Sequence, residues 1–253
     1  MLKQDIWEQR VVFGTMISEV ATPNVIRIMK VAGFDYVIVD CEHGYFDFSQ
    51  LANMAAVGNG FGMPVIVRIP FIEREFITKT LDMGADGILV PMVNTADEAR
   101  KVVEYAKYPP IGKRGVSTTR AHTNYMPPPL SEYMDIANDR TVVLLQIETE
   151  QGAQNAEEIA SIEGIDALMI GPNDLAVDLG TPSQLDTELM REVIGGVLDS
   201  AKKAGKQCGI IGSDIKFLGK WKNEGMTILS HGSEVGMIMK SAKAACHEFS
   251  LIK

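Results

Sequence analysis

The chain has 253 residues, of which 46% are hydrophobic and 23% are charged, and its formal net charge is −9. This length allows one large core, so we expect a single domain over residues 1–253. An acidic chain is a poor match for nucleic acids, which proteins bind with an excess of Lys and Arg. No apolar stretch approaches the roughly 18 residues of a membrane span, and the polar start MLKQDIWEQR does not resemble a signal peptide.

Short apolar segments rich in Val and Ile alternate with longer segments of helical periodicity. This alternation is typical of βα units around a parallel sheet that is buried on both faces. In chain order, the predicted strands are Val12–Ile17, Tyr36–Val39, Val65–Ile69, Ile88–Val93, Val142–Glu148, Ala167–Ile170, Cys208–Ile211 and Met226–Leu229. The predicted helices lie near residues 23–33, 47–59, 73–84, 95–107, 151–162, 187–205, 214–224 and 233–248.

Eight strand–helix units in about 250 residues match a (β/α)8 TIM barrel, with a doubly wound open sheet as the alternative. Residues 108–135 interrupt the rhythm with several prolines and form a long connection that has room for small helices. The three cysteines, Cys41, Cys208 and Cys246, are odd in number and widely spaced, which predicts a reducing compartment and a cytoplasmic protein.

Two acidic residues follow strongly apolar runs at the ends of the fifth and sixth strands. Reactive groups of such barrels gather where strands end, so Glu148 and Asp174 should meet at one rim. A divalent cation would relieve the repulsion between two buried carboxylates, and oxygen ligands suit Mg²⁺ or Mn²⁺ better than zinc. The alternative is that either acid caps a helix or pairs with an arginine.

The residues around these two acids suggest a substrate site. Gln146 lies two positions before Glu148 and therefore faces the same side of the strand, where it could bind substrate or fill a polar layer of the barrel. Gly171, Pro172 and Asn173 precede Asp174 in a predicted tight turn whose backbone amides could hold a carboxylate. A plain strand-to-helix turn would have a similar sequence.

An arginine and a histidine complete the predicted rim. Arg68 ends the run VIVR, where its guanidinium could stabilise a developing enolate or form a salt bridge. His43 follows the second strand in the sequence DCEH and is suited to acid–base chemistry, with His231 as its main rival. Every lysine falls in a helix, a loop or a terminus, which makes an imine mechanism a poor fit.

Motifs in a fixed order along nearly the whole chain resemble the HpcH/HpaI class II pyruvate aldolases. The motifs are Phe13-Gly14, Asp40-x-Glu42-His43, Val67-Arg68, the run from Gly84 to Val93, Lys113-Arg114-Gly115-Val116, Gln146-Ile147-Glu148 and the run from Gly171 to Leu175. The resemblance implies a (β/α)8 barrel, commonly a hexamer whose last helix swaps onto a neighbouring barrel. It also implies a divalent cation such as Mg²⁺, Mn²⁺ or Co²⁺.

The resemblance assigns roles to the rim residues. Glu148 and Asp174 would ligate the metal, and Gln146 would hold the 2-oxo acid together with the segment Gly171, Pro172, Asn173 and Asp174. His43 would be the base and Arg68 would stabilise the enolate. The family also uses an acid to support the histidine: Asp82 matches it by motif, whereas proximity in the sequence favours Asp40.

We therefore expect a metal-dependent aldolase that reversibly cleaves a 4-hydroxy-2-oxo acid into pyruvate and an aldehyde. The sequence departs from the family pattern at residues 117–122 and 230–234, near the expected substrate entrance or subunit contact, so the aldehyde stays open. Gly-Ser pairs at residues 212–213 and 232–233 leave a phosphate-binding isomerase as one alternative. A silent barrel that only binds a 2-oxo acid is another.

Overall fold

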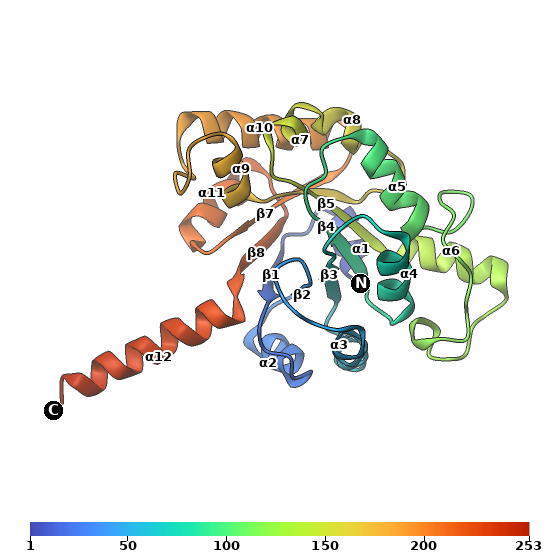
Figure 1. The fold of residues 1–253 in the computed structure, drawn as a ribbon, viewed down its shortest axis with the longest axis horizontal. Coiled ribbons are helices and arrows are strands. Elements are labelled where there is room, and N and C mark those ends of the chain that lie inside the picture. Colours follow the sequence, from blue (N-terminus) through green and yellow to red (C-terminus); the bar gives the residue numbers. More distant parts are fainter. Residues whose placement is uncertain (253) are drawn as a thin grey trace.

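In a computed structural model that describes residues 1–252, eight parallel strands close into a barrel in the order β1 to β8 (Figure 1). The predicted (β/α)8 architecture is therefore confirmed, and the open-sheet alternative is wrong. The strands are β1 (Val12–Ile17), β2 (Tyr36–Asp40), β3 (Val65–Arg68), β4 (Gly87–Val90), β5 (Val142–Ile147), β6 (Ala167–Ile170), β7 (Gln207–Gly212) and β8 (Ile228–Ser233).

Helices surround the barrel, and one large apolar core fills the space between them and the strands. Seven of them follow the predicted helical segments: α2 (Asn24–Ala32), α3 (Phe48–Phe61), α4 (Arg74–Asp82), α5 (Ala96–Ala106), α10 (Glu188–Lys203), α11 (Ile215–Glu224) and α12 (Glu234–Ser250). The predicted helix near 151–162 is divided into α7 (Glu150–Gln154) and α8 (Ala156–Ala160). At the division, the side chain of Asn155 donates a hydrogen bond to the backbone oxygen of Asn94 at 2.7 Å.

A second apolar cluster fills the barrel interior and explains α1 (Leu2–Trp7), a helix that the sequence analysis did not predict. Leu2 and Ile6 of α1 belong to the same buried cluster as interior residues such as Ile38 and Leu144. This short helix therefore closes the amino-terminal end of the barrel. The carboxyl ends of the strands are left as the open mouth.

The long connection after α5 contains a 3₁₀ turn, η1 (Ala121–Thr123), and a full helix, α6 (Leu130–Arg140). Proline at position 129 precedes α6, and a small separate cluster of Tyr108, Tyr133 and Ala137 anchors it. Only three residues of α6 are buried, so its sequence shows little amphipathic periodicity. This is why the pattern of hydrophobic residues left it undefined.

The last strand differs from its prediction. Met226–Leu229 was expected from the apolar residues, but β8 runs over Ile228–Ser233 because Ser230 and His231 pair with β1 and β7 through the backbone. Backbone pairing carries no hydrophobic signal. His231 thus lies in the strand rather than after it.

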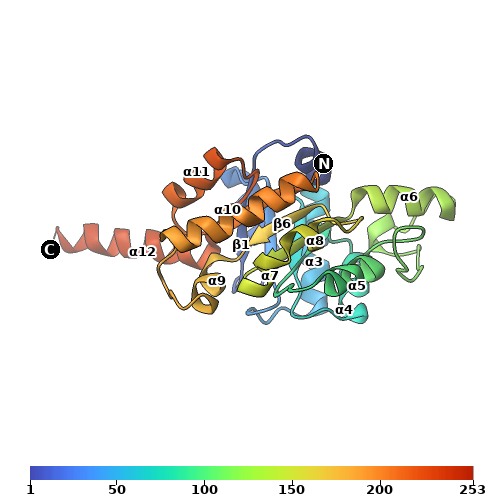
Figure 2. The ribbon, with the colours of Figure 1, turned by 90° about the horizontal axis from the view of Figure 1, so that it is seen from above.

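The final helix, α12 (Glu234–Ser250), projects away from the barrel in both views of the chain (Figures 1 and 2). Only Glu234, its first residue, is buried. Every residue from Lys240 to Ser250 is exposed to solvent. Within residues 1–252, no helix combines the length and the apolar character needed to cross a lipid bilayer.

Candidate active site

Arg68 lies at the mouth of the barrel in a network with two carboxylates. The register of β2 and β3 places Arg68 opposite Asp40, and its Nε and Nη2 atoms donate to the two carboxylate oxygens of Asp40 at 2.8 and 2.7 Å. Its Nη1 atom lies 3.0 Å from the carboxylate of Glu42. Burial alone would raise the pKa of Asp40, but the bonds from Arg68 outweigh it and lower that pKa.

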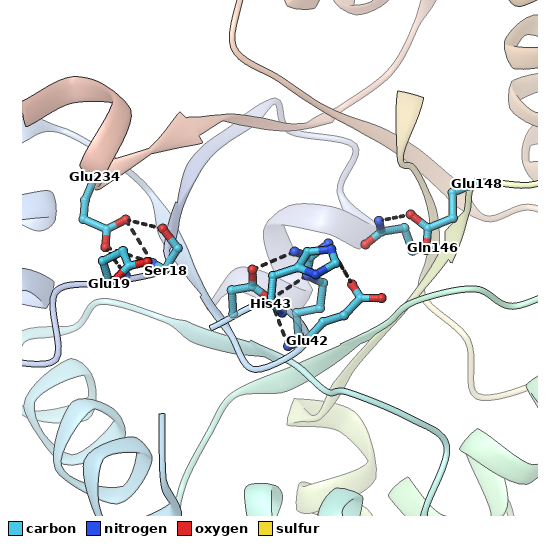
Figure 3. Close-up of polar contacts among 9 residues, drawn as sticks. Ser18, Glu19, Glu42, His43, Gln146, Glu148 and Glu234 are labelled. Carbon is cyan, nitrogen blue, oxygen red and sulfur yellow. Dashed lines mark hydrogen bonds and ion pairs between the residues drawn. The ribbon is translucent and has the colours of Figure 1, made fainter. Parts of the chain in front are cut away.

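His43 lies beside Glu42 of this network (Figure 3). The carboxylate of Asp40 accepts hydrogen bonds from the backbone N–H groups of Glu42 and His43, at 3.0 and 3.4 Å, which fixes the turn after β2. The imidazole is 69% exposed, and its Nε2 atom lies 3.9 Å from a carboxylate oxygen of Glu42. Of the two acids next to it in the sequence, Glu42 therefore approaches the ring, whereas Asp40 holds the backbone.

Glu148 is deeply buried at the mouth, with 2% exposure. One carboxylate oxygen accepts the backbone N–H of Met92 at 2.7 Å, and the other accepts a short hydrogen bond from the side-chain amide of Gln146. Met92 adopts a left-handed conformation with φ of 54°. Burial raises the pKa of Glu148 to about 7, and the negative charges of Glu42 and Asp174 add to this effect.

Asp174 comes to the same mouth from the first turn of α9 (Pro172–Asp178), a short helix where the sequence suggested a tight turn. Its side chain and that of Asn173 are exposed, whereas Gly171 and Pro172 are buried. The charge of Asp174 raises the pKa of both Glu42 and Glu148. The structure therefore brings the two predicted metal ligands within electrostatic range of each other.

The donor set around Glu148 fits a hard divalent cation. The Oε1 atom of Gln146 is buried without a hydrogen-bond partner among residues 1–252, and a carboxylate with a raised pKa is the group that a cation would stabilise in its charged form. In the described part of the chain no three His, Cys, Asp or Glu side chains converge on a common point. Two carboxylates with open positions suit Mg²⁺ or Mn²⁺, which keep several water molecules or substrate oxygens.

Comparisons with known proteins show the family of the chain. A model of the HpcH/HpaI aldolase/citrate lyase family matches residues 15–241. The chain belongs to this family. It is 32% identical to a hydroxypyruvate/pyruvate aldolase of Roseovarius nubinhibens over 88% of this chain and 86% of the relative.

Two further similarities extend over almost the full length of the chain. A 5-keto-4-deoxy-D-glucarate aldolase of Citrobacter koseri is 32% identical, over 95% of this chain and 93% of the relative. The crystal structure of an HpcH/HpaI aldolase from Desulfitobacterium hafniense DCB-2 superposes with a TM-score of 0.93 at 32% identity, covering 98% of this chain and 96% of the other. The family resemblance inferred from the ordered motifs is thus confirmed.

Asp82, the acid that the HpcH/HpaI motif assigns to the histidine, lies elsewhere in the chain. It ends α4, on the side of the barrel where the helices return to the amino ends of the strands. Its carboxylate binds Arg114 at 2.5 Å, and its backbone oxygen accepts a hydrogen bond from His122 at 3.0 Å. Within one chain, Asp82 is therefore not brought to His43, and its catalytic role stays a prediction.

Two other residues bear on the sequence analysis. The rival histidine, His231, stacks on Phe13, with ring centroids 6.1 Å apart. Lys107, directly after α5, is a buried lysine: burial lowers its pKa to about 7, and its amine donates to the backbone oxygens of Asn138 and Thr141. Because it packs beside α1 and α6 at the closed end of the barrel, it does not face the mouth.

Gly171 lies against the side chains of Glu148 and Gln146, where there is no room for a larger residue. A Cβ atom at this position would lie 2.4 Å from a carboxylate oxygen of Glu148 and 2.7 Å from the side-chain nitrogen of Gln146. We expect Gly171→Ala to displace both side chains and to reduce pyruvate proton exchange by about 10²-fold. Gly195→Ala is the matched control, because nothing lies within 4 Å of that added methyl; equal rates in the two variants would contradict this packing.

Proposed function

We propose that the chain is a metal-dependent aldolase that reversibly cleaves a 4-hydroxy-2-oxo acid into pyruvate and an aldehyde. Membership of an aldolase family and relatives named as aldolases support a carbon–carbon lyase. The observation that carries the proposal is the cluster of Glu148, Gln146 and Asp174 at the mouth beside the pair of Arg68 and His43. An acid–base group next to a carboxylate cradle is the arrangement that this chemistry needs.

Glu148 and Asp174 would hold Mg²⁺, Mn²⁺ or Co²⁺. When bound, the cation polarises the 2-keto group and spreads the negative charge that develops on cleavage. The side-chain amide nitrogen of Gln146 donates to Glu148, which fixes the orientation of the side chain. Its Oε1 atom, which has no partner among the described residues, would then contact the 2-oxo acid. The backbone from Gly171 to Asn173 would bound the same pocket on the side of β6.

Arg68 would supply preorganised hydrogen-bond donors to the developing oxyanion. Its guanidinium has five N–H groups, of which two donate to Asp40, while its Nη1 atom forms an ion pair with Glu42. The remaining N–H groups could donate to a substrate oxygen. Because the guanidinium is locked in place, this stabilisation requires no reorganisation during the reaction.

His43 would move the proton. In the cleavage direction it would take the proton from the 4-hydroxyl group, the C3–C4 bond would break, and its electrons would pass to the 2-oxo acid half as the aldehyde forms. The same imidazole would then return the proton to C3 to give pyruvate. The exposure of the ring at the mouth suits it to this task, since both proton positions belong to a substrate that enters from solvent.

We also infer that the chain assembles with copies of itself, commonly as a hexamer in its family, with α12 docked on a neighbouring barrel. The support is that α12 projects from its own barrel while carrying exposed apolar residues such as Ile238, Met239 and Phe249. A helix of this composition has a face to bury. The three free cysteines of the described residues fit the expected cytoplasmic location.

Exchange of the methyl protons of pyruvate in D₂O tests the proposed chemistry without the unknown aldehyde. We expect exchange with Mn²⁺ or Co²⁺, its loss after rigorous chelation, and its recovery when the metal is restored. His43→Ala should lower the exchange rate by at least about 10²-fold. Exchange that continues unchanged after chelation would refute the metal-dependent mechanism.

A further inference from the structure

The loop after β1, residues 18–20, is held by the buried carboxylate of Glu234, a residue to which the sequence analysis assigned no role. Glu234, the first residue of α12, is fully buried, and its carboxylate accepts the backbone N–H groups of Ser18, Glu19 and Val20 at 2.6 to 2.9 Å. The hydroxyl of Ser18 adds a fourth donor at 3.2 Å. Figure 3 shows this arrangement on the side of His43 opposite Glu148. The loop is thus held rigidly at the mouth.

This loop packs directly on the turn that carries His43. A Cβ atom at Gly44 would lie 2.1 Å from the backbone oxygen of Asp40 and 3.1 Å from that of Ser18, so the two segments touch through the glycine. The hydroxyl of Tyr45 donates to the carboxylate of Glu19 at 2.8 Å. The charge of Glu19 therefore lies beside the histidine turn. The hydrogen bond to Glu19, together with this charge, raises the pKa of Tyr45.

The charges on this side of the mouth are predominantly negative. Glu19 is exposed, and in the part of the chain that the structure describes it has no cationic side chain within 4 Å. The charge of Arg68, the one arginine of the network, is offset by its ion pairs with Asp40 and Glu42. Glu42 keeps a raised pKa, because burial outweighs the attraction of Arg68. A second carboxylate on the substrate would meet repulsion here.

We propose that the aldehyde half of the substrate is uncharged and carries hydroxyl groups, with Glu19 as the specificity-determining residue that disfavours an aldehyde acid. This inference rests on the proposed aldolase activity and names its substrate class. Glu19 accepts hydrogen bonds from hydroxyl groups, whereas it repels a carboxylate. The pair of Glu19 and Tyr45 thus offers an acceptor and a hydroxyl to a sugar-like aldehyde.

The experiment compares two three-carbon aldehydes that differ at one end: glyceraldehyde ends in a hydroxymethyl group and tartronate semialdehyde in a carboxylate. Aldol addition of pyruvate to each is measured with the full assembled protein and Mn²⁺. We expect kcat/KM to favour glyceraldehyde by about 10-fold. Glu19→Gln, which still accepts the Tyr45 bond, should reduce this preference about 5-fold through a lower KM for the anionic aldehyde.

Two controls make the outcome decisive. Glu224→Gln changes an exposed acid at the end of α11, on the closed side of the barrel, and should leave the preference unaltered. Raising the ionic strength should weaken the preference of the native protein, a result that does not depend on any variant folding. An equal or better rate with tartronate semialdehyde, or a preference unchanged by Glu19→Gln, would overturn the inference while pyruvate proton exchange persists. Absence of that exchange would instead overturn the proposed activity, and this inference with it.

Discussion

Replacing Glu148 by glutamine is expected to slow metal-dependent pyruvate proton exchange by about 10³-fold or more while the barrel stays folded. The variant keeps the shape of the side chain and removes one of the two anionic oxygen donors proposed for the cation. The rate is measured in D₂O with saturating Mn²⁺. Glu150→Gln is the matched control, because that acid lies two residues away with an exposed side chain. Near-native exchange in Glu148→Gln would exclude this carboxylate as a ligand.

The same variant tests the electrostatics of the metal-free protein. Because the pKa of Glu148 is raised from 4.5 to about 7, the folded state binds its proton more tightly than the unfolded state does. The contribution of protonated Glu148 to the unfolding free energy is therefore fully present below pH 4.5, and it is lost as the pH rises through about 7. The unfolding free energy of the native protein minus that of Glu148→Gln should therefore fall by about 3 kcal/mol over this window. Urea titrations from pH 4.5 to 8 measure it, and a constant difference would contradict the raised pKa.

Removing Arg68 should have the largest effect on stability. In Arg68→Met, the carboxylates of Asp40 and Glu42 stay in place without their cation, and Asp40 is only 3% exposed. Loss of one partner of a buried ion pair typically costs about 3–5 kcal/mol, and we expect a decrease in unfolding free energy at the lower end of that range. Proton exchange should also be lost, since the oxyanion donors go with the guanidinium.

A double variant separates the ion pair from the packing of the arginine side chain. In Arg68→Met with Asp40→Asn, the buried carboxylate is replaced by a neutral amide, so part of the lost stability should return. Chemical denaturation of the two single variants and the double variant gives the interaction energy. A stability of Arg68→Met within about 1 kcal/mol of native would show that the network contributes little to the fold.

The barrel could be predicted from the sequence because its strands are buried on both faces. Runs such as Val65–Val67 and Val142–Leu145 are continuously apolar, and the polar residue that ends each run marks the mouth. This is why Arg68 and Glu148 were placed on one rim. Neighbouring strands of a barrel share their carboxyl ends, so chain order was sufficient to bring these residues together.

Features that depend on tertiary contacts could not be predicted from the sequence. α1 is too short for a helical pattern and exists because Leu2 and Ile6 close the bottom of the barrel. The role of Glu234 could not be foreseen, since its three amide partners lie more than 200 residues away. The sequence did contain one indication of an unusual role. Glu234 directly follows Ser233, the residue that caps α12, and it lies in the segment 230–234 that departs from the family pattern.

The partner of His43 shows how sequence distance and family motif can both mislead within one chain. Asp40 is nearer in the sequence, but its carboxylate is committed to Arg68 and to two backbone amides. Asp82 matches the motif, but it is paired with Arg114 at the far end of α4. Glu42 is the acid whose carboxylate lies 3.9 Å from the ring.

Anomalous scattering from crystals grown with Mn²⁺ and oxamate would test the central claim most directly. The account predicts one strong manganese peak at the mouth of the barrel, coordinated by carboxylate oxygens of Glu148 and Asp174, with oxamate bound to the same ion beside Gln146. Mn²⁺ bound elsewhere, or coordinated by neither of these acids, would contradict the account.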